Sequence, residues 1–287
     1  MFDQVRVFHQ PRTVKEAVGL LHNADAKTCV VAGATDLVLR APRSVTALVD
    51  IGRLGLSYVK RDGGAVRIGA TTTLAELQQS AIIRRLANGI LAEAAACCGG
   101  IQTRNMASIG GNLANASPAA DMAAPLLALD AAVMLQSLRG KHRVPLAEFF
   151  SGPHKTVAKR ALVVEILIPA GKPRTAWSFQ RLARTETDIA IVNVAAAIQI
   201  DRQNRCTCAR IALGAVAPQP MRAARAEACL TRQAITRELI DGAAETAAGE
   251  ARPISDLRAS AEYRREMSRV LVRRALEECV NRLGRAL

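Results

Sequence analysis

The segment from Gly99 to Asp130 constrains this chain more than any other, because it places small and polar residues between two strongly helical segments. Gly110 and Gly111 lack a Cβ atom, so the main chain there can approach a ligand closely. Ser108 and Asn112 place short hydrogen-bonding side chains beside that exposed backbone. A tight turn between two core elements would explain a lone Gly-Gly pair. The length of this polar, glycine-containing segment instead favours a loop that holds a phosphate.

The same segment predicts a helix next to this loop. Pro118 suits the first turn of a helix running to about Leu129, whose free N–H groups and positive dipole end can support an anion. Asp121 in that turn can accept a hydrogen bond from a sugar hydroxyl. Simple charge complementarity at the helix N-terminus is the alternative role of Asp121, and the two roles are compatible.

A second loop of similar character follows the strand expected at Thr28–Val31. The strand leads into Ala32-Gly33-Ala34-Thr35-Asp36-Leu37, and successive N–H groups in such a turn form a concave nest for anions. Turns of this composition are common, so this loop alone is weak evidence. Two such loops in one domain predict a diphosphate gripped from two sides.

Together, VVAGATDL at 30–37 and RNMASIGGNLANASPAAD at 104–121 resemble the FAD-binding subunit of the molybdenum hydroxylases. That is the family of xanthine dehydrogenase, carbon monoxide dehydrogenase and the bacterial hydroxylases of aromatic N-heterocycles. FQRLARTETDIA at 179–190 is similar to the start of the family's C-terminal domain, so the resemblance covers nearly the whole chain. It implies an α+β fold: a two-subdomain FAD-binding domain of the vanillyl-alcohol-oxidase type, not a Rossmann fold, followed by a small antiparallel sheet with helices.

The resemblance also implies which residues bind FAD. The first loop would wrap the diphosphate through backbone N–H groups, and the second would lie near the phosphates and the ribityl chain. Many relatives carry glycine where Ala34 stands, so the turn must tolerate a Cβ or this residue must sit at negative φ. We expect no catalytic residue and no metal ligand in this chain. The expected cofactor-binding residues are Val31, Ala32, Gly33, Ala34, Thr35, Asp36, Leu37, Ser108, Gly110, Gly111, Asn112, Ala116, Asp121, Val163 and Arg181.

Three of the positions near the flavin have alternative interpretations. Arg181 lies near a family lysine, although a one-residue gap is needed further along. A cation at the flavin N1/C2 edge would stabilise the anionic reduced flavin and raise its potential, whereas the alternative is a surface arginine on a strand. Cys98 falls where some relatives have a bulky residue beside the cofactor, and Val163 where some have a leucine near the isoalloxazine ring. For Cys98 and Val163, a plain core role is the favoured interpretation.

The composition agrees with a folded protein of two domains, because the chain has 287 residues of which 50% are hydrophobic. The N-terminal MFDQVRVFHQ lacks the features of a signal peptide, and no apolar run approaches the roughly 20 residues of a membrane span. Seven cysteines without a CxxC pair do not match zinc or iron–sulfur ligation. We therefore expect a cytoplasmic protein with reduced thiols and any iron–sulfur centre in a partner.

A formal charge of +14 raises the possibility of nucleic-acid binding. Aromatic residues make up only 3% of the chain, however, and the basic residues are spread along it instead of forming one run. Near the C-terminus, Arg273 with Glu277 and Arg274 with Glu278 have helical i,i+4 spacing. This pattern is typical of a solvated helix face or a subunit interface, so we expect no nucleic-acid partner.

The order of apolar and turn-forming residues predicts a FAD-binding domain at 1–170, with subdomains at about 1–55 and 56–170, and a C-terminal domain at 174–287. Capping-box patterns at Thr13 and Thr73 predict helix starts, and a third helix is expected from about Ile82 to Cys98. From Ala223 onward the chain is expected to be helical, with a final helix near Ala259–Leu283. Besides a strand at the N-terminus, strands are expected at Thr28–Val31, Thr46–Ile51, Ala65–Ala70, Ala132–Gln136, Ala161–Ile168, Trp177–Ala183, Val192–Ile200 and Ala209–Val216.

No Ser-His-Asp or Cys-His arrangement is apparent, and the four histidines lack ligand spacing, so we expect an electron-transfer subunit and not a self-contained enzyme. By resemblance, a molybdenum large subunit would hydroxylate the substrate. Electrons would pass through [2Fe-2S] clusters of a small subunit to FAD here and then to an acceptor such as NAD, in a dimer of heterotrimers. The alternatives are a stand-alone FAD oxidoreductase of the same fold and a basic assembly or nucleic-acid-binding protein without flavin.

Overall fold

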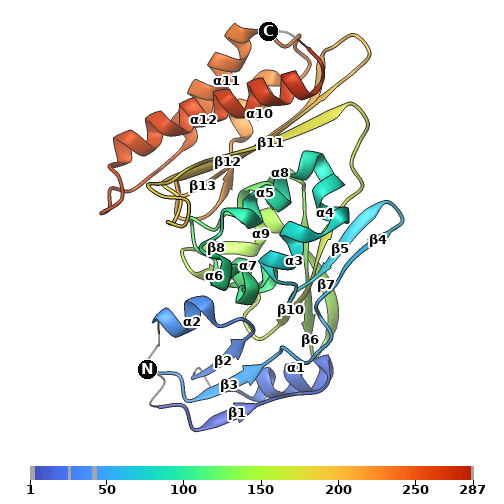
Figure 1. Cartoon of the computed structure of the whole chain (residues 1–287), viewed down its shortest axis with the longest axis vertical. Coiled ribbons are helices and arrows are strands. Elements are labelled where there is room, and N and C mark those ends of the chain that lie inside the picture. The colour runs from blue at the N-terminus through green and yellow to red at the C-terminus, as the bar shows by residue number, and fades with distance from the viewer. Residues whose placement is uncertain (1–3, 25–26, 41–43, 286–287) are drawn as a thin grey trace.

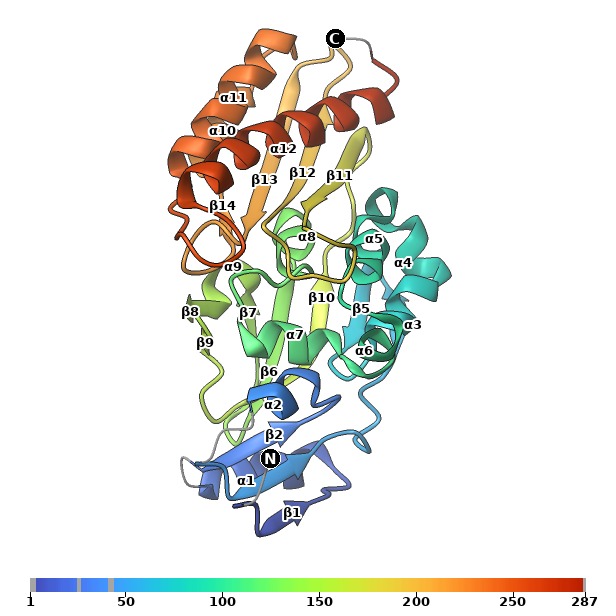
Figure 2. The ribbon, with the colours of Figure 1, turned by 60° about the vertical axis from the view of Figure 1, so that its left-hand side comes forward.

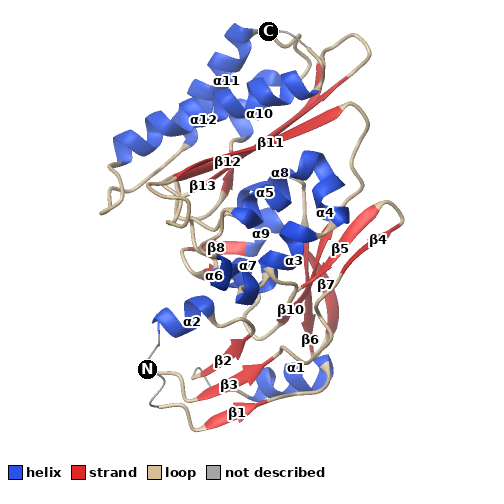
Figure 3. Cartoon of the chain, in the orientation of Figure 1, coloured by secondary structure: helices blue, strands red, loops and turns tan. Residues whose placement is uncertain are grey.

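The computed structural model describes residues 4–24, 27–40 and 44–285. Three tiers follow one another along the long axis: a small N-terminal unit, a central sheet with helices, and a C-terminal sheet with helices (Figure 1). Helices and strands are mixed in every tier (Figure 3), which confirms the expected α+β fold.

The N-terminal unit is a parallel three-stranded sheet in the order β1-β3-β2, as the β-α-β pattern predicts. Its first helix begins after Thr13, whose side chain accepts a hydrogen bond from the backbone N–H of Glu16. The Glu16 carboxylate accepts from Arg12 N and not from Thr13 N, so only half of the predicted capping box forms there. The elements are β1 (Val7–His9), α1 (Val14–Asn23), β2 (Thr28–Val31), α2 (Thr35–Arg40) and β3 (Ala47–Asp50).

The central sheet is antiparallel, in the order β4-β5-β10-β6-β7. Its edge strands β4 (Val59–Asp62) and β7 (Gly140–Pro145) are absent from the sequence-based expectations, because they are rich in exposed charged residues and lack apolar periodicity. The inner strands are β5 (Ala65–Gly69), β6 (Ala132–Ser137) and β10 (Leu162–Ile168), and a short α9 (Leu146–Phe149) leads to the hairpin of β8 (Phe150–Gly152) and β9 (Lys155–Thr156).

The prediction of a single helix from Ile82 to Cys98 is wrong. Both hydrogen bonds of the predicted capping box start α3 (Leu74–Gln79), but the chain then forms α4 (Ala81–Arg85), the 3₁₀ turn η1 (Leu86–Gly89) and α5 (Ile90–Ala96). Ala87, Asn88 and Gly89 have φ of 49°, 57° and 83°, which no right-handed helix allows. This break in the helix contacts a distant part of the chain, because the Asn88 side chain accepts a hydrogen bond from Trp177 N at 2.9 Å.

The C-terminal tier is a four-stranded antiparallel sheet in sequence order, covered on one face by three helices (Figure 2), as expected. Sequence periodicity predicts β12 (Val192–Ile200) with its observed bounds, while β13 (Cys206–Gly214) begins three residues before its expected start. The pairs Arg273–Glu277 and Arg274–Glu278 are not among the ion pairs of the described residues; Glu278 pairs with Arg282 instead. The other elements are β11 (Thr175–Leu182), β14 (Met221–Arg222), α10 (Ala224–Leu230), α11 (Arg237–Glu250) and α12 (Ala261–Arg282).

Strand β12 joins two of the three hydrophobic cores, because both of its faces are buried. Val194, Ala196 and Ile198 face the core beneath α10 to α12, as their period-two spacing predicts. Ala195 belongs to the central core, and α8 (Ala123–Ala128) packs against the same face of the strand. A third, smaller core lies between α1, the N-terminal sheet and the near face of the central sheet. The polar residue Asn193 is therefore buried where the C-terminal sheet meets the central tier.

Candidate functional site

The first predicted loop is a tight turn that runs into a helix. The turn covers Ala32 to Ala34, and residues 35–37 form the first turn of α2, not a continuous loop. Ala34 has φ of 56°, so the turn tolerates a Cβ in the left-handed region and the negative-φ alternative is wrong. The first hydrogen bond of the helix runs from Val38 N to Ala34 O at 2.9 Å. The backbone N–H groups of residues 35–37, in the first turn of α2, have no carbonyl acceptor within the helix. They therefore remain available as hydrogen-bond donors to a ligand.

The second predicted motif is also helical, contrary to the loop expected from its glycines. It forms α6 (Ile101–Met106) and α7 (Ile109–Asn115), and Ser108 caps α7 by accepting from Gly111 N at 3.2 Å. Gly110 N donates to Ala70 O at 2.9 Å, and a Cβ on Gly110 would lie 2.6 Å from that same oxygen. Gly110 thus holds α7 against the end of β5, and its N–H group is already used. Gly111, by contrast, is exposed.

The fold brings these two motifs into direct contact, with α2 beside α6 and α7 (Figures 1 and 2). A Cβ on Gly33 would lie 1.7 Å from Met106 O, so glycine is required where the turn crosses the end of α6. Asn115 Nδ2 donates to Asp36 Oδ2 at 2.8 Å and ties the two helices together. The two predicted motifs therefore lie in direct contact, and both are built on helix ends.

The helix expected to begin at Pro118 begins at Ala123 instead, because residues 118–122 form turns. Asp121 therefore precedes the helix and is not in its first turn. Its Oδ1 accepts from Arg181 Nε at 3.1 Å and from Asn193 Nδ2 at 2.8 Å. Burial raises the pKa of Asp121, and the Arg181 charge and these two hydrogen bonds partly offset that rise.

Arg181 is not a surface arginine, so that alternative is wrong. Its side chain is 9% exposed, against 7% for Asp121, and its guanidinium also donates to the carbonyl oxygen of Asp188. The ion pair links β11 of the C-terminal tier to the turn before α8 in the central tier. A buried pair of this kind fixes the relative position of the two segments.

Sequence analysis missed Asn193, which completes this cluster. It is fully buried, and its Oδ1 has no hydrogen-bond partner among the described residues. A Cβ on Gly214 would lie 2.3 Å from that oxygen, so glycine on the paired strand makes room for the amide. An asparagine among the apolar residues that precede Gln199 in this strand was the available signal, because such a residue needs a buried partner.

The remaining predicted residues are packed. Cys98 is buried, its Sγ lies 4.0 Å from Asp121 Oδ2, and burial raises the pKa of its thiol. Val163 belongs to the central core. Ala116 ends α7 at φ of 48° and accepts a hydrogen bond from His154 N at 2.9 Å. Val163 and Ala116 can therefore shape the site only through their apolar surface.

The donors and acceptors at this site fit a flavin nucleotide. The first turn of α2 offers N–H donors suited to a diphosphate. Asn112 offers the opposite chemistry, since its Oδ1 is buried without a partner among the described residues and an amide oxygen can only accept. It suits a sugar-alcohol hydroxyl and not a phosphate. Across residues 4–24, 27–40 and 44–285, no group of three or more His, Cys, Asp or Glu is arranged to hold a metal ion. Within the same ranges, no helix has both the length and the apolar character needed to cross a membrane.

Comparison with known families agrees with this chemistry. Residues 2–171 match the family described as the FAD binding domain in molybdopterin dehydrogenase, and residues 177–279 match the CO dehydrogenase flavoprotein C-terminal domain. The chain therefore belongs to the FAD-binding subunits of the molybdenum hydroxylase family, and it is a flavoprotein component of an oxidoreductase.

The relatives that the chain resembles are subunits of dehydrogenases. It is 34% identical over 276 residues to the carbon monoxide dehydrogenase medium chain of Hydrogenophaga pseudoflava, covering 94% of this chain and 95% of that one. It is 33% identical to the 6-hydroxypseudooxynicotine dehydrogenase complex subunit alpha of Paenarthrobacter nicotinovorans, with 94% and 93% covered. The solved carbon monoxide dehydrogenase of H. pseudoflava that lacks the Mo-pyranopterin moiety superimposes with a TM-score of 0.92, 33% identity and 97% and 98% coverage. For quinoline 2-oxidoreductase from Pseudomonas putida 86 the TM-score is 0.88, at 27% identity with 97% and 98% coverage.

Proposed function

We propose that this chain holds FAD between its two motifs and thereby links [2Fe-2S] clusters of a small partner subunit to an electron acceptor such as NAD. A molybdenum large subunit would carry out substrate hydroxylation, and the assembly would be a cytoplasmic dimer of heterotrimers. In this proposal residues 1–170 form the flavin domain and 174–287 the C-terminal domain. The direct contact of the two motifs, at Gly33 with Met106 and at Asp36 with Asn115, carries the proposal.

Each part of the site has a role in this proposal. The N–H groups at the start of α2 bind the diphosphate, and Asn112 Oδ1 accepts from a ribityl hydroxyl. Bound FAD supplies the redox chemistry. The buried cluster of Arg181, Asp121 and Asn193 adds a fixed charge distribution beside it, which is how a protein tunes the potential of a bound cofactor.

The two alternatives receive no support from a specific contact. A stand-alone flavin oxidoreductase needs a substrate-binding base, and the titratable cluster described at this site is neutralised internally. A nucleic-acid-binding protein needs free cations on one face, but several of the arginines are already paired with acids, such as Arg210 and Arg222 with Asp130.

The test is purification of the native protein from its source, followed by a visible spectrum and a metal assay. We expect FAD, iron and molybdenum to appear together with two further polypeptides. If the chain arrives alone with FAD, the stand-alone oxidoreductase replaces this proposal. If it arrives without flavin, the site itself is wrongly assigned.

A further inference from the structure

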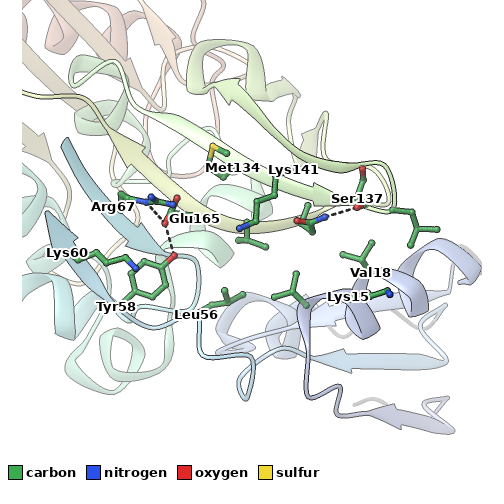
Figure 4. Close-up of a pocket in the computed structure, with 14 residues that line it drawn as sticks. Lys15, Val18, Leu56, Tyr58, Lys60, Arg67, Met134, Ser137, Lys141 and Glu165 are labelled. Atoms are coloured by element: carbon green, nitrogen blue, oxygen red, sulfur yellow. Dashed lines mark hydrogen bonds and ion pairs between the residues drawn. The ribbon is translucent and has the colours of Figure 1, made fainter. Parts of the chain in front are cut away.

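The chain has a cavity of about 550 Å³ that does not involve the flavin site (Figure 4). It lies between α1 of the N-terminal unit and the strands of the central sheet. None of the residues assigned to FAD lines it. The cavity lies against the third core, whereas α7 and α8 cover the other face of the same sheet.

The floor of this cavity is apolar. Val18, Leu56 and Val164 line it and are also members of the third core, and Val14 and Met134 pack against that core and line the cavity as well. Val18, Leu56 and Val164 are nearly fully buried, whereas Val14 and Met134 are partly exposed. A ligand resting here would cover the apolar surface of Val14 and Met134, which favours an apolar ligand body.

A β-bulge shapes the cavity wall. The pairing of β10 with β6 shifts between Val163 and Glu165, and both Val164 and Glu165 then line the cavity. Bulges often re-aim a side chain in this way. Glu165 is only 5% exposed, and its Oε2 accepts from Tyr58 Oη at 2.7 Å and from Arg67 Nε at 2.8 Å. Arg67 is shared between two carboxylates, because its Nη1 also donates to Asp62 Oδ2 at 2.8 Å.

Three further cations border the cavity. Lys15 comes from α1, Lys60 from β4 and Lys141 from β7, so they belong to three different elements. None of the three appears in an ion pair of the described residues. Lys60 Nζ lies 4.5 Å from the centroid of the Tyr58 ring, and Figure 4 shows Lys141 reaching over the cavity. Set against Asp62 and Glu165, these three lysines and Arg67 still leave excess positive charge above an apolar floor.

We propose that this cavity is a second ligand site, which binds a small organic anion made of a carboxylate or phosphate ester on an apolar body. The anionic group lies between Lys60 and Lys141, and the apolar body covers Val14 and Met134. The site is independent of FAD, because it shares no residue with the two flavin motifs.

The test is isothermal titration calorimetry of the purified native assembly with octanoate, octan-1-ol and inorganic phosphate. We expect octanoate to bind saturably at one site per chain. Octan-1-ol lacks the charge and inorganic phosphate lacks the apolar body, so both should bind at least several-fold more weakly. The ligand chemistry is wrong if octan-1-ol binds as tightly as octanoate, or if phosphate does.

Matched variants test whether the lysines around the cavity form the binding site. Lys60→Gln and Lys141→Gln should each weaken octanoate binding roughly threefold, and the double variant about tenfold, since each exposed charge contributes modestly. Arg61→Gln is the control, because this neighbour on β4 points to the opposite side of the strand. An assembly that does not bind octanoate overturns the proposal. Unchanged affinity in the double lysine variant overturns it too, whatever the flavin content.

Discussion

Arg181 Nε lies 3.1 Å from Asp121 Oδ1, and both side chains are less than one tenth exposed. The two residues come from the two parts of the chain that match separate family domains. Asn193 donates to the same carboxylate oxygen from the neighbouring strand β12. One carboxylate thus accepts hydrogen bonds from two strands of the C-terminal sheet, and this cluster lies at the boundary between the tiers.

Replacing Arg181 should expose the energetic role of this pair. Arg181→Ala leaves Asp121 buried without its cation, and we expect the free energy of unfolding to fall by about 3–5 kcal/mol. The flavin potential should also fall, because a positive charge is lost beside the cofactor. Denaturant titration and potentiometry of the assembly measure these effects. Arg184→Ala removes an exposed i,i+4 pair with Asp188 and serves as the control, with a change below about 1 kcal/mol. An unchanged potential in Arg181→Ala would remove this residue from the flavin environment.

The same variant should show an altered pH dependence. Burial already raises the pKa of Asp121, and loss of Arg181 removes the largest opposing influence, so the pKa rises further. Below that raised value the native state binds a proton that the unfolded state does not, so unfolding free energy increases as the pH falls. The deficit of Arg181→Ala relative to the native chain should therefore shrink on going from neutral to mildly acidic pH. A deficit that grows on acidification would contradict this assignment.

Two adjacent glycines should respond differently to substitution. Gly111 is exposed, and a Cβ there would meet only the Ser108 hydroxyl, a side-chain atom, at 2.9 Å. Under the proposed function, Gly111→Leu should therefore abolish flavin binding while the chain stays folded. Gly110→Ala should instead destabilise the fold, because its Cβ would lie 2.6 Å from Ala70 O. Flavin absorbance and circular dichroism of each variant separate the two effects. A flavin-replete Gly111→Leu protein would show that α7 does not face the cofactor.

Asn193 and Gly214 should be energetically coupled. Asn193→Ala removes a donor from Asp121, and Gly214→Ala places a Cβ 2.3 Å from Asn193 Oδ1, so each change alone should destabilise the protein by roughly 1–3 kcal/mol. In the double variant the steric conflict disappears, and the combined loss should be smaller than the sum of the single losses. A thermodynamic cycle from urea titrations measures this, and strict additivity would mean that the two side chains do not interact.

The phenol of Tyr58 should lose its proton only at unusually high pH. Burial and its hydrogen bond to Glu165 raise the pKa of Tyr58 to about 12. The contribution of this group to stability is therefore present below its unfolded pKa of about 10 and is lost as the pH rises towards 12. The chain has only two tyrosines, so subtracting the alkaline absorbance titration of Tyr58→Phe from that of the native chain isolates this group. A midpoint near 10 for the difference would contradict the buried bond to Glu165.

Sequence reasoning succeeded where local pattern and burial agree. The alternating apolar residues of Val192–Ile200 predicted β12, and the short apolar run Thr28–Val31 predicted β2. It failed where a distant contact decides the local structure. The break at Asn88 depends on Trp177, which lies 89 positions away. The helical form of the second motif depends on Ala70 and Thr72, which accept the hydrogen bonds of its first turn.

The site was predictable only in outline. Its two motifs could be paired by their glycines and their resemblance to one family, but the different roles of Gly110 and Gly111 depend on what each packs against. Asn193 could not be assigned to the site from the sequence, because its partner Asp121 is 72 positions away. Arg181 and Asp121 were each expected at the cofactor, but their ion pair and their burial follow only from the docking of the two tiers.

The contact between Asp36 and Asn115 joins residues 79 positions apart, and the close approach of Gly33 to Met106 depends on the same meeting of helices. Closing so long a loop is entropically costly and tends to occur late in folding. During synthesis, the first motif cannot contact α6 and α7 until these helices have left the ribosome. We therefore expect the nucleotide to bind only after these two motifs have met, so the supply of flavin would influence a later folding step and not the first.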